Sequence, residues 1–309
     1  MLIISSRGIK VDELIYMEIK NWIMSHARPL EQKRFLYLFE SGSKEEATNE
    51  LIKYQNLDGG FGHGLEPDSI NPNSSPIQTW AAFEIIDELK LDKNDLLVRK
   101  IINYFMNKKD FENGFWFTTI PSNNEYPRAS WWNYANDRKI WGYNPTAAIH
   151  GFIYHYALLE EEKAFVAPLI KRAIHAFLDE THNEMHELRA FIQLYEYIKE
   201  DYIDSTLLQD FKVKLQNLIY STVEKDSSKW FTSYCARPSQ LVQNNKTAGY
   251  DIIKNLFIKE KSMLIENRDT DGVWKVTWNW GQFEDAFLKS KIAWKGIIAI
   301  GNLKIIKKI

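Results

Sequence analysis

The chain is poor in several features that define common protein classes. It has a single cysteine, Cys235, so it forms neither an internal disulfide nor a zinc site built from several cysteines. No apolar run approaches the ~18 residues that a membrane-spanning helix needs, and residues 1–7 lack the basic segment of a secretory signal. The 39 Lys and Arg are balanced by 41 Asp and Glu, which excludes the basic excess of a nucleic-acid-binding surface. We expect a cytoplasmic protein without a nucleic-acid partner.

Aromatic residues are abundant by contrast. They make up 14% of the 309 residues and include 11 Trp, while 45% of the chain is apolar and 26% is charged. This balance is typical of a folded globular chain and excludes a disordered acidic one. The excess of large rings predicts either a highly aromatic core or a cavity lined by aromatic side chains.

Helix start signals recur along the chain. Ser43, Ser75 and Thr181 each stand three residues before a Glu or Gln in the capping-box pattern, and Ser75 and Asn144 are each followed by a proline. Apolar residues recur at spacings of three and four, and no segment alternates in the manner of a strand. We predict an all-α fold. Its helices are expected near residues 11–25, 30–41, 44–55, 76–90, 95–108, 145–160, 164–179, 182–198, 204–223, 250–266 and 283–303.

Turns that contain glycine and lead into aromatic residues separate several of these helices. Gly60, Gly114 and Gly272 mark the clearest three, with spacings of 114 − 60 = 54 and 272 − 114 = 158 residues. The second spacing accommodates three further units of about 53 residues, a period typical of stacked or ring-closed helical pairs. We predict a single domain of repeated helical hairpins over residues 1–309.

Two of these segments resemble a known repeat. Residues 55–62 read Gln-x-x-Asp-Gly-Gly-Phe-Gly and lead through a polar loop into a proline-started helix with Thr-Trp-Ala-Ala at 79–82. A C-terminal copy has Asp-Gly-Val-Trp at 271–274, followed by Ala-Trp-Lys-Gly at 293–296. The pattern is similar to the repeat of the terpenoid cyclase and protein prenyltransferase superfamily. The resemblance implies an α–α toroid, in which inner and outer helices surround a central cavity.

The catalytic motifs of that superfamily are missing. Prenyltransferases hold zinc with Asp-x-Cys and a later His, whereas Ser233 stands two residues before Cys235 and no His follows His186. The chain has no Asp-x-Asp-Asp motif of squalene-type cyclases, and no two Asp are adjacent as in the magnesium-binding Asp-Asp-x-x-Asp. We expect no metal and no cofactor, and the resemblance supports the fold more than a cyclase-like or prenyltransferase-like reaction.

The loop directly after the first glycine turn carries three titratable side chains, His63, Glu66 and Asp68. If this loop faces a cavity, burial beside a second carboxylate raises the pKa of one carboxyl group and makes it a proton donor near neutral pH. We predict a catalytic site at these three residues. The structural alternative is that Glu66 and Asp68 cap neighbouring helices while His63 bonds a backbone carbonyl.

A second candidate is the long loop at residues 121–144, which is too aromatic for a disordered segment. Aromatic faces stabilise cations and stack on sugar rings. With tryptophans near the C-terminus, this loop is predicted to form the substrate-binding wall of a central cavity, and the alternative is an aromatic lid packed on helix ends. The predicted wall comprises Arg128, Trp131, Trp132, Trp141, Tyr143, Trp274, Trp278 and Trp280.

Three weaker features each have two interpretations. Cys235 lies near Arg237, a cation that lowers a thiol pKa, but no partner His is placed beside it. His182 and His186 share a helix face, which fits either a two-histidine metal site or a solvated polar face, and they do not complete a His-Glu-x-x-His motif. Residues 289–309 contain six Lys and no acid, which fits either contact with an anionic membrane or a core helix with a solvated end.

Three functions follow from these patterns. The first is an enzyme acting on an isoprenoid-like or other apolar small molecule in the toroid cavity, with Asp68 or Glu66 as the general acid. The second is a carbohydrate-active enzyme, in which Glu66 pairs with Glu187 or Asp285 across the cavity. The third is a non-catalytic toroid that binds a ligand or a partner protein.

Overall fold

The computed structural model describes residues 13–179 and 184–307. These residues form a mostly helical structure with one two-stranded sheet, β1 (Phe111–Glu112) and β2 (Phe115–Trp116). The helices are α1 (Glu13–His26), α2 (Pro29–Phe39), α3 (Lys44–Ile52), α4 (Pro76–Leu89), α5 (Leu96–Met106), α6 (Thr146–Tyr156), α7 (Glu160–Asp179), α8 (Met185–Ile198), α9 (Ser205–Thr222), α10 (Pro238–Leu241), α11 (Tyr250–Glu266) and α12 (Glu284–Lys307).

Each predicted helix is present, and two of the predicted caps explain where helices begin. Ser43 and Ser75 are the N-caps of α3 and α4, and their hydroxyl groups accept hydrogen bonds from the backbone N–H groups of Glu46 and Gln78. These bonds satisfy donors that a helix start leaves unpaired. The cap predicted at Thr181 lies outside the described residues.

The predicted cap at Asn144 is wrong. Pro145 occupies the N-cap position of α6, and no side chain caps this helix start. Asn144 instead pairs with Trp141 in an isolated antiparallel bridge, and its carbonyl accepts a hydrogen bond from Thr118 Oγ1 at 3.0 Å. The residue therefore ends the preceding loop rather than starting the helix.

The β1–β2 hairpin is the one departure from an all-α structure within the described residues. Asn113 and Gly114 form its two-residue turn, with φ of 51° and 86°. Positive φ at both positions is the requirement of a tight hairpin turn, and Asn-Gly is the dipeptide that meets it most readily. The four-residue helix α10 was also not expected from the sequence.

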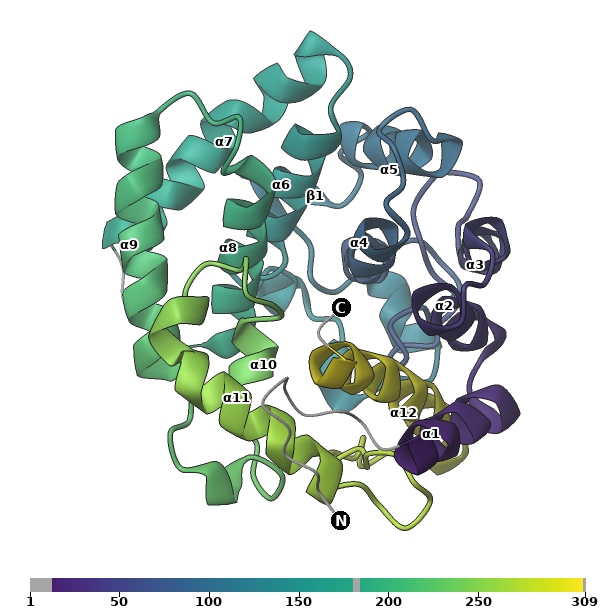
Figure 1. Ribbon diagram of the computed structural model, residues 1–309. Helices are drawn as coiled ribbons and strands as arrows, with labels where there is room; N and C mark the ends of the chain where they lie inside the picture. Colours follow the sequence, from purple (N-terminus) through teal and green to yellow (C-terminus); the bar gives the residue numbers. More distant parts are fainter. Residues whose placement is uncertain (1–12, 180–183, 308–309) are drawn as a thin grey trace.

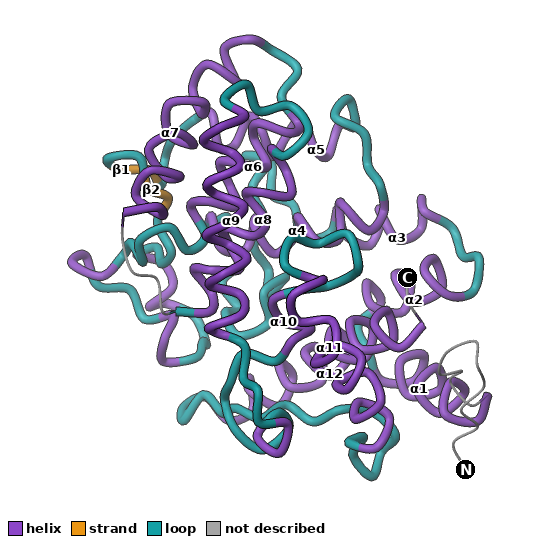
Figure 2. The backbone as a smooth tube through the Cα atoms, turned by 60° about the vertical axis from the view of Figure 1, so that its left-hand side comes forward, coloured by secondary structure: helices purple, strands orange, loops and turns teal. Residues whose placement is uncertain are grey.

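The helices alternate between the middle and the edge of the molecule. In Figure 1, α4, α6, α8 and α12 lie toward the middle, and we call them the central helices; α3, α5, α7, α9 and α11 lie at the periphery, and we call them the outer helices. Neighbours in the chain pack together, as α5 does on α6 and α9 on α8, while α6 also packs on α8 (Figure 2). The last helix, α12, contacts α1 and α2, so the two ends of the described chain meet.

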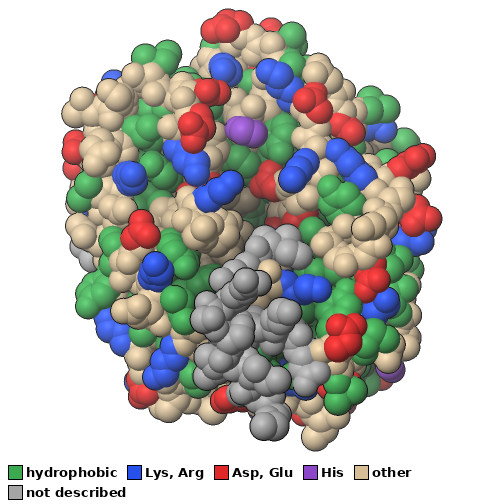
Figure 3. Space-filling model, viewed as in Figure 1, with side chains coloured by type: hydrophobic (Ala, Val, Ile, Leu, Met, Phe, Trp, Pro, Cys, Tyr) green, Lys and Arg blue, Asp and Glu red, His purple; other side chains and the backbone are tan. Residues whose placement is uncertain are grey.

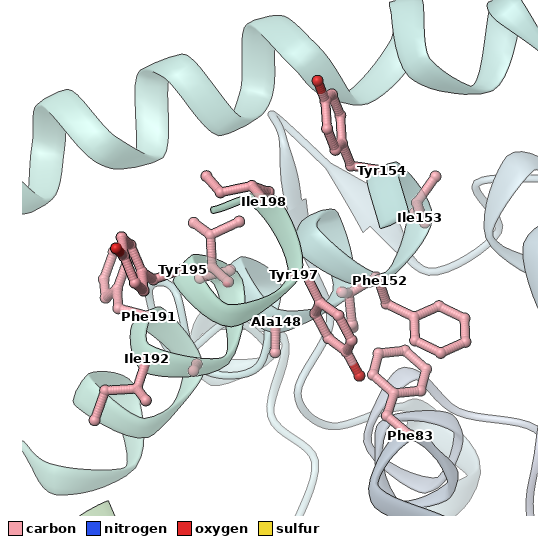
Figure 4. Close-up of a cluster of buried hydrophobic side chains, with 14 of the residues drawn as sticks. Phe83, Ala148, Phe152, Ile153, Tyr154, Phe191, Ile192, Tyr195, Tyr197 and Ile198 are labelled. Atoms are coloured by element: carbon pink, nitrogen blue, oxygen red, sulfur yellow. The ribbon is translucent and has the colours of Figure 1, made fainter. Parts of the chain in front are cut away.

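The main core is built between the central helices. Every side chain of α6 except that of His155 is buried. Phe152 of α6 stacks on Phe83 of α4 with ring centroids 3.7 Å apart, and Tyr197 of α8 meets Phe152 edge-on at 5.9 Å (Figure 4). These contacts hold α4, α6 and α8 in fixed positions relative to one another.

The lysine-rich C-terminal segment is part of α12. Lys295 forms an ion pair with Asp271, and Lys304 pairs with Glu88 at 2.7 Å, so both cations serve contacts within the fold. Lys308 lies outside the described residues. No helix in the described segments combines the length and the apolar character needed to cross a membrane.

Candidate functional site

The loop between α3 and α4 is fixed to the first turn of α4. The Phe61 N–H donates to Thr79 Oγ1 at 3.0 Å. Gln78 Oε1 accepts the Glu66 N–H at 2.8 Å, while Gln78 Nε2 donates to the carbonyls of Ser69 at 2.7 Å and Glu66 at 3.3 Å. The Gln78 side chain thus holds the loop segment 66–69 instead of completing a capping box.

Asp68 is buried, with 3% of its surface exposed, and it joins segments that are distant in sequence. Its Oδ1 accepts hydrogen bonds from Trp280 Nε1 at 2.7 Å and Ser290 Oγ at 2.8 Å, and its Oδ2 accepts one from Trp278 Nε1 at 3.0 Å. Burial raises the pKa of Asp68 above its ordinary value, although these donors act in the opposite direction. The carboxyl group is fully engaged in positioning its neighbours.

The Glu66 carboxyl group, in contrast to that of Asp68, has one oxygen without a hydrogen-bond partner among the described residues. Its side chain is half-buried, and its Oε2 is sealed from solvent without a hydrogen-bond partner among the described residues. Burial, followed by the charge of Asp68, raises the pKa of Glu66 well above its ordinary value, and this is only partly offset by the backbone N–H of Asp68, by Arg28 and by Trp132. Glu66 and Asp68 are two residues apart in the sequence. Because their environments differ, the Glu66 carboxyl group binds its proton more strongly than the Asp68 carboxyl group does.

Tryptophans from several segments surround these acids. Trp132 stacks on Trp141 with centroids 5.3 Å apart and an interplanar angle of 2°. The Ala129 N–H donates to the Asp68 carbonyl at 2.8 Å, which ties the 121–144 loop to the acidic loop. The group that we call the tryptophan cluster comprises Ile77, Trp80, Ala129, Trp132, Trp141, Trp278, Trp280 and Phe287.

Two residues of the predicted aromatic wall lie elsewhere. Trp274 is buried in a separate core beside α1 and α12, and its Nε1 donates to the Leu264 carbonyl at 2.9 Å. Tyr143 packs in the main core against Phe115 and Phe191. The structure corrects their assignment to the substrate wall, because both rings fill cores that hold helices together.

Other predicted site residues lie at the surface. His63 is exposed, and its Nε2 forms a hydrogen bond with Asn56 Oδ1 at 2.9 Å instead of the expected backbone carbonyl. Trp131 is 38% exposed, and Arg128 is half-buried at the rim of the tryptophan cluster. Of the three predicted catalytic residues, the structure therefore brings the two acids together and leaves the histidine outside.

The remaining candidate side chains are dispersed. Glu187 accepts a hydrogen bond from the Tyr143 N–H at 2.9 Å, and Asp285 is exposed in the first turn of α12. Burial raises the pKa of the Cys235 thiol, which is the opposite of the change that would activate it. His182 lies outside the described residues, within which no group of three or more His, Cys, Asp or Glu side chains is placed to hold a metal ion.

The sequence did not reveal a second polar group, which continues from the tryptophan cluster along α4. Trp80 Nε1 donates to Gln193 Oε1 of α8 at 2.7 Å. One turn further along the same helix face are three acids, which we call the acidic row: Glu84, Asp87 and Glu88. Their spacing of three and four on a helix with many buried residues was the signal that could have identified them.

Cations from other helices meet the acidic row. Arg34 of α2 lies 2.8 Å from Glu88, whose side chain is 5% exposed. Lys304 of α12 lies 2.7 Å from Glu88 and 3.6 Å from Glu84. Although burial alone raises the pKa of Glu84, the charges of Lys304, Arg34 and Arg189 together lower it below its ordinary value, which favours the ionised carboxylate.

Two hollows on the described surface lie away from these groups. One, of about 1020 Å³, is bordered by α1, α12 and the loop between α11 and α12. The other, of about 260 Å³, lies beside α8 and α9. Neither is lined by Glu66, Asp68 or a member of the tryptophan cluster.

The functional argument therefore depends on the residues themselves. No known protein family, curated protein or solved structure matches this chain.

Proposed function

We propose that the chain folds as an α–α toroid, with the central helices inside and the outer helices around them. The alternation of the two sets along the chain supports this arrangement (Figure 1). Gly59, Gly114 and Gly272 all have positive φ and each follows an outer helix and precedes a central one, as expected of a structural repeat. The contacts of α12 with α1 and α2 supply the closure.

We further propose that the protein is an enzyme in which Glu66 donates a proton to the substrate. The observation that carries this proposal is the unpartnered, sealed oxygen of Glu66 beside the hydrogen-bonded carboxyl of Asp68. A pair of acids whose surroundings separate their affinities for protons is the arrangement that general acid catalysis uses.

The neighbouring groups have complementary roles in this proposal. Asp68 is a positioning residue, because its oxygens already accept hydrogen bonds from two indoles and a hydroxyl. When Asp68 is ionised, its negative charge opposes loss of the proton from Glu66, so that Glu66 stays protonated. Trp80, Trp141 and Trp278 are partly exposed and offer ring faces to a bound substrate.

The polar and charged side chains that continue from the tryptophan cluster along α4 favour a hydroxylated substrate, such as a carbohydrate, over an isoprenoid-like one. Gln193, Glu84 and Lys304 lie along the path that continues from Trp80. Charged and amide groups offer hydrogen bonds to hydroxyl groups, whereas burying them against a hydrocarbon chain is costly. In this proposal Glu66 protonates the leaving oxygen as the glycosidic C–O bond breaks. A water molecule forms the new C–O bond at the anomeric carbon, and the proton that this water releases restores the acid form of Glu66.

A substrate panel tests the proposal. The wild-type protein is incubated with nitrophenyl glycosides and oligosaccharides, and in a second arm with isoprenoid diphosphates and squalene. We expect turnover in the carbohydrate arm, and we expect Glu66→Gln to lower it by about 10²–10⁴-fold because the amide donates no proton. The thermal midpoint of this variant is expected to stay close to that of the wild type, since Gln has the shape of the neutral acid.

The exposed Glu125, in the same group of loops, provides the matched control. Glu125→Gln removes a carboxyl group without touching the site, so its activity is expected to equal that of the wild type. Turnover in the isoprenoid arm alone would contradict the substrate class. Full activity of Glu66→Gln would contradict the role of the acid, and no turnover in either arm would favour a non-catalytic binding protein.

A further inference from the structure

The larger of the two hollows lies between α1 and α12, and the turn that follows α11 borders one side of it. In the fold, α12 packs on both α1 and α11 (Figure 1). The hollow has a volume of about 1020 Å³, the size of the larger small-molecule sites in proteins. It uses a different face of α12 from the proposed active site, since Lys291 lines the hollow whereas Ser290 donates to Asp68.

Two ion pairs fix the borders of the hollow. Lys295 of α12 pairs with Asp271 of the turn, which also accepts a hydrogen bond from Trp22 Nε1 of α1 at 3.1 Å. Arg268 of the turn pairs with Glu18 of α1 at 2.7 Å. These four charges are matched within the fold, so they hold the hollow open and leave other charges to meet a ligand.

The unmatched charges of the hollow are separated by sign. Lys291 extends from α12, while Glu266, the last residue of α11, and Asp269 of the turn supply the negative side. None of these three residues takes part in an ion pair within the described segments. The C-terminal end of the α11 dipole adds to the negative side. On the face of the molecule shown in Figure 3, by contrast, acidic and basic side chains are interspersed.

Aliphatic side chains accompany these charges. Leu288 and Ile292 stand one turn apart on the same face of α12 as Lys291, and they are 58% and 43% exposed. Ile265 of α11 also lines the hollow. A ligand with charged ends and an apolar part would therefore match the charges and remove aliphatic surface from water.

We propose that this hollow binds a short peptide with free termini, whose ammonium group lies next to Glu266 and Asp269 and whose carboxylate lies next to Lys291. An apolar side chain of the peptide covers Leu288 and Ile292. The volume favours a peptide over a single amino acid, which carries the same two charges but leaves most of the hollow unfilled. This site does not depend on the reaction proposed above.

Direct titration tests this site without a substrate. The tripeptide Ala-Leu-Ala is added to the intact chain at pH 7.5, and binding is followed by calorimetry and by ligand-observed NMR. Its N-acetylated and C-amidated form has the same side chains without the terminal charges. We expect saturable binding of the free tripeptide at one site and at least about tenfold weaker binding of the capped form, because hydrogen bonds to charged groups are the stronger ones.

The carboxylate end is assigned by one variant and two peptides. Lys291→Gln is expected to weaken binding of Ala-Leu-Ala by about tenfold. The same variant is expected to bind Ala-Leu-Ala-amide as the wild type does, since this peptide has no carboxylate to lose. Lys254→Gln, an exposed cation on α11 that does not line the hollow, is the matched control and is expected to bind both peptides as the wild type does.

The ammonium end is assigned in the same way. The double variant Glu266→Gln, Asp269→Asn is expected to weaken binding of Ala-Leu-Ala but not of N-acetyl-Ala-Leu-Ala, which has no ammonium group. Equal affinity for the free and capped tripeptides, equal affinity of Lys291→Gln and wild type for the free tripeptide, or no saturable binding would each overturn the proposal. If Lys291→Gln does not fold, the comparison of the free and capped tripeptides on the wild type decides.

Discussion

Replacing Asp68 with alanine is expected to lower the free energy of unfolding by about 3 kcal/mol or more, because each buried donor left without an acceptor costs about 1–3 kcal/mol. Two indole N–H groups, of Trp278 and Trp280, and the Ser290 hydroxyl all donate to this one carboxyl group. Urea unfolding followed by tryptophan fluorescence measures the loss.

Ser290→Ala provides a graded comparison, since it removes one donor and leaves the carboxyl group with two. Its expected cost is about 1 kcal/mol. If Asp68→Ala cost no more than Ser290→Ala, the indoles would have other acceptors and the positioning role of Asp68 would be contradicted. Asp68→Asn is expected to lie between the two, because its amide oxygen still accepts.

Arg34→Met is expected to destabilise the protein by up to about 3 kcal/mol, because the buried Glu88 carboxylate loses one of its two cations and keeps Lys304 alone. The guanidinium is 4% exposed and donates to Glu88, which itself is almost fully buried. Removal of the cation also adds to the repulsion among the three acids of the acidic row. Thermal and urea unfolding at pH 7 report the change.

The double variant Arg34→Met, Glu88→Leu separates charge from packing. Replacing both partners of a buried ion pair with apolar side chains is often neutral. The second change is therefore expected to restore part of the lost stability, since it also leaves Lys304 with Glu84 as its ion-pair partner. A double variant less stable than the sum of its single variants would show that the pair contributes more than charge balance. An unchanged stability of Arg34→Met would contradict the assignment of this network as buried.

The sequence predicted the helices well where local chemistry decides the structure. Ser43 and Ser75 are real caps, and the helices that follow them begin within a residue of the expected positions. The hairpin was missed because Asn113 and Gly114 were interpreted as a repeat turn, although Asn-Gly between aromatic residues is itself a hairpin signal. Asn144 is not a helix cap because its backbone pairs with that of Trp141, and no local sequence pattern encodes this pairing.

Part of the candidate site could also be predicted, because that part depends on local sequence. Glu66 and Asp68 lie in one short loop, so their proximity follows from the sequence. Their pairing with Trp132, Trp278 and Trp280 depends on packing between segments up to 212 residues apart, and composition alone placed Trp274 with them incorrectly. The hydrogen bonds that Asp87 accepts from Tyr156 and Tyr197 likewise join α4 to two other helices, and no property of α4 by itself predicts these contacts.

The protonation state of Glu66 is the central claim, and carboxyl-carbon NMR of protein labelled with ¹³C at glutamate measures it directly. Spectra recorded across the acidic and neutral range are compared with those of Glu66→Gln to assign the signal. We predict that the Glu66 signal titrates well above the ordinary value of 4.5, after the exposed glutamates have ionised. A Glu66 signal that titrates together with those of the exposed glutamates would show that Glu66 is an ordinary carboxylate. This result would contradict the proposal that Glu66 is a general acid.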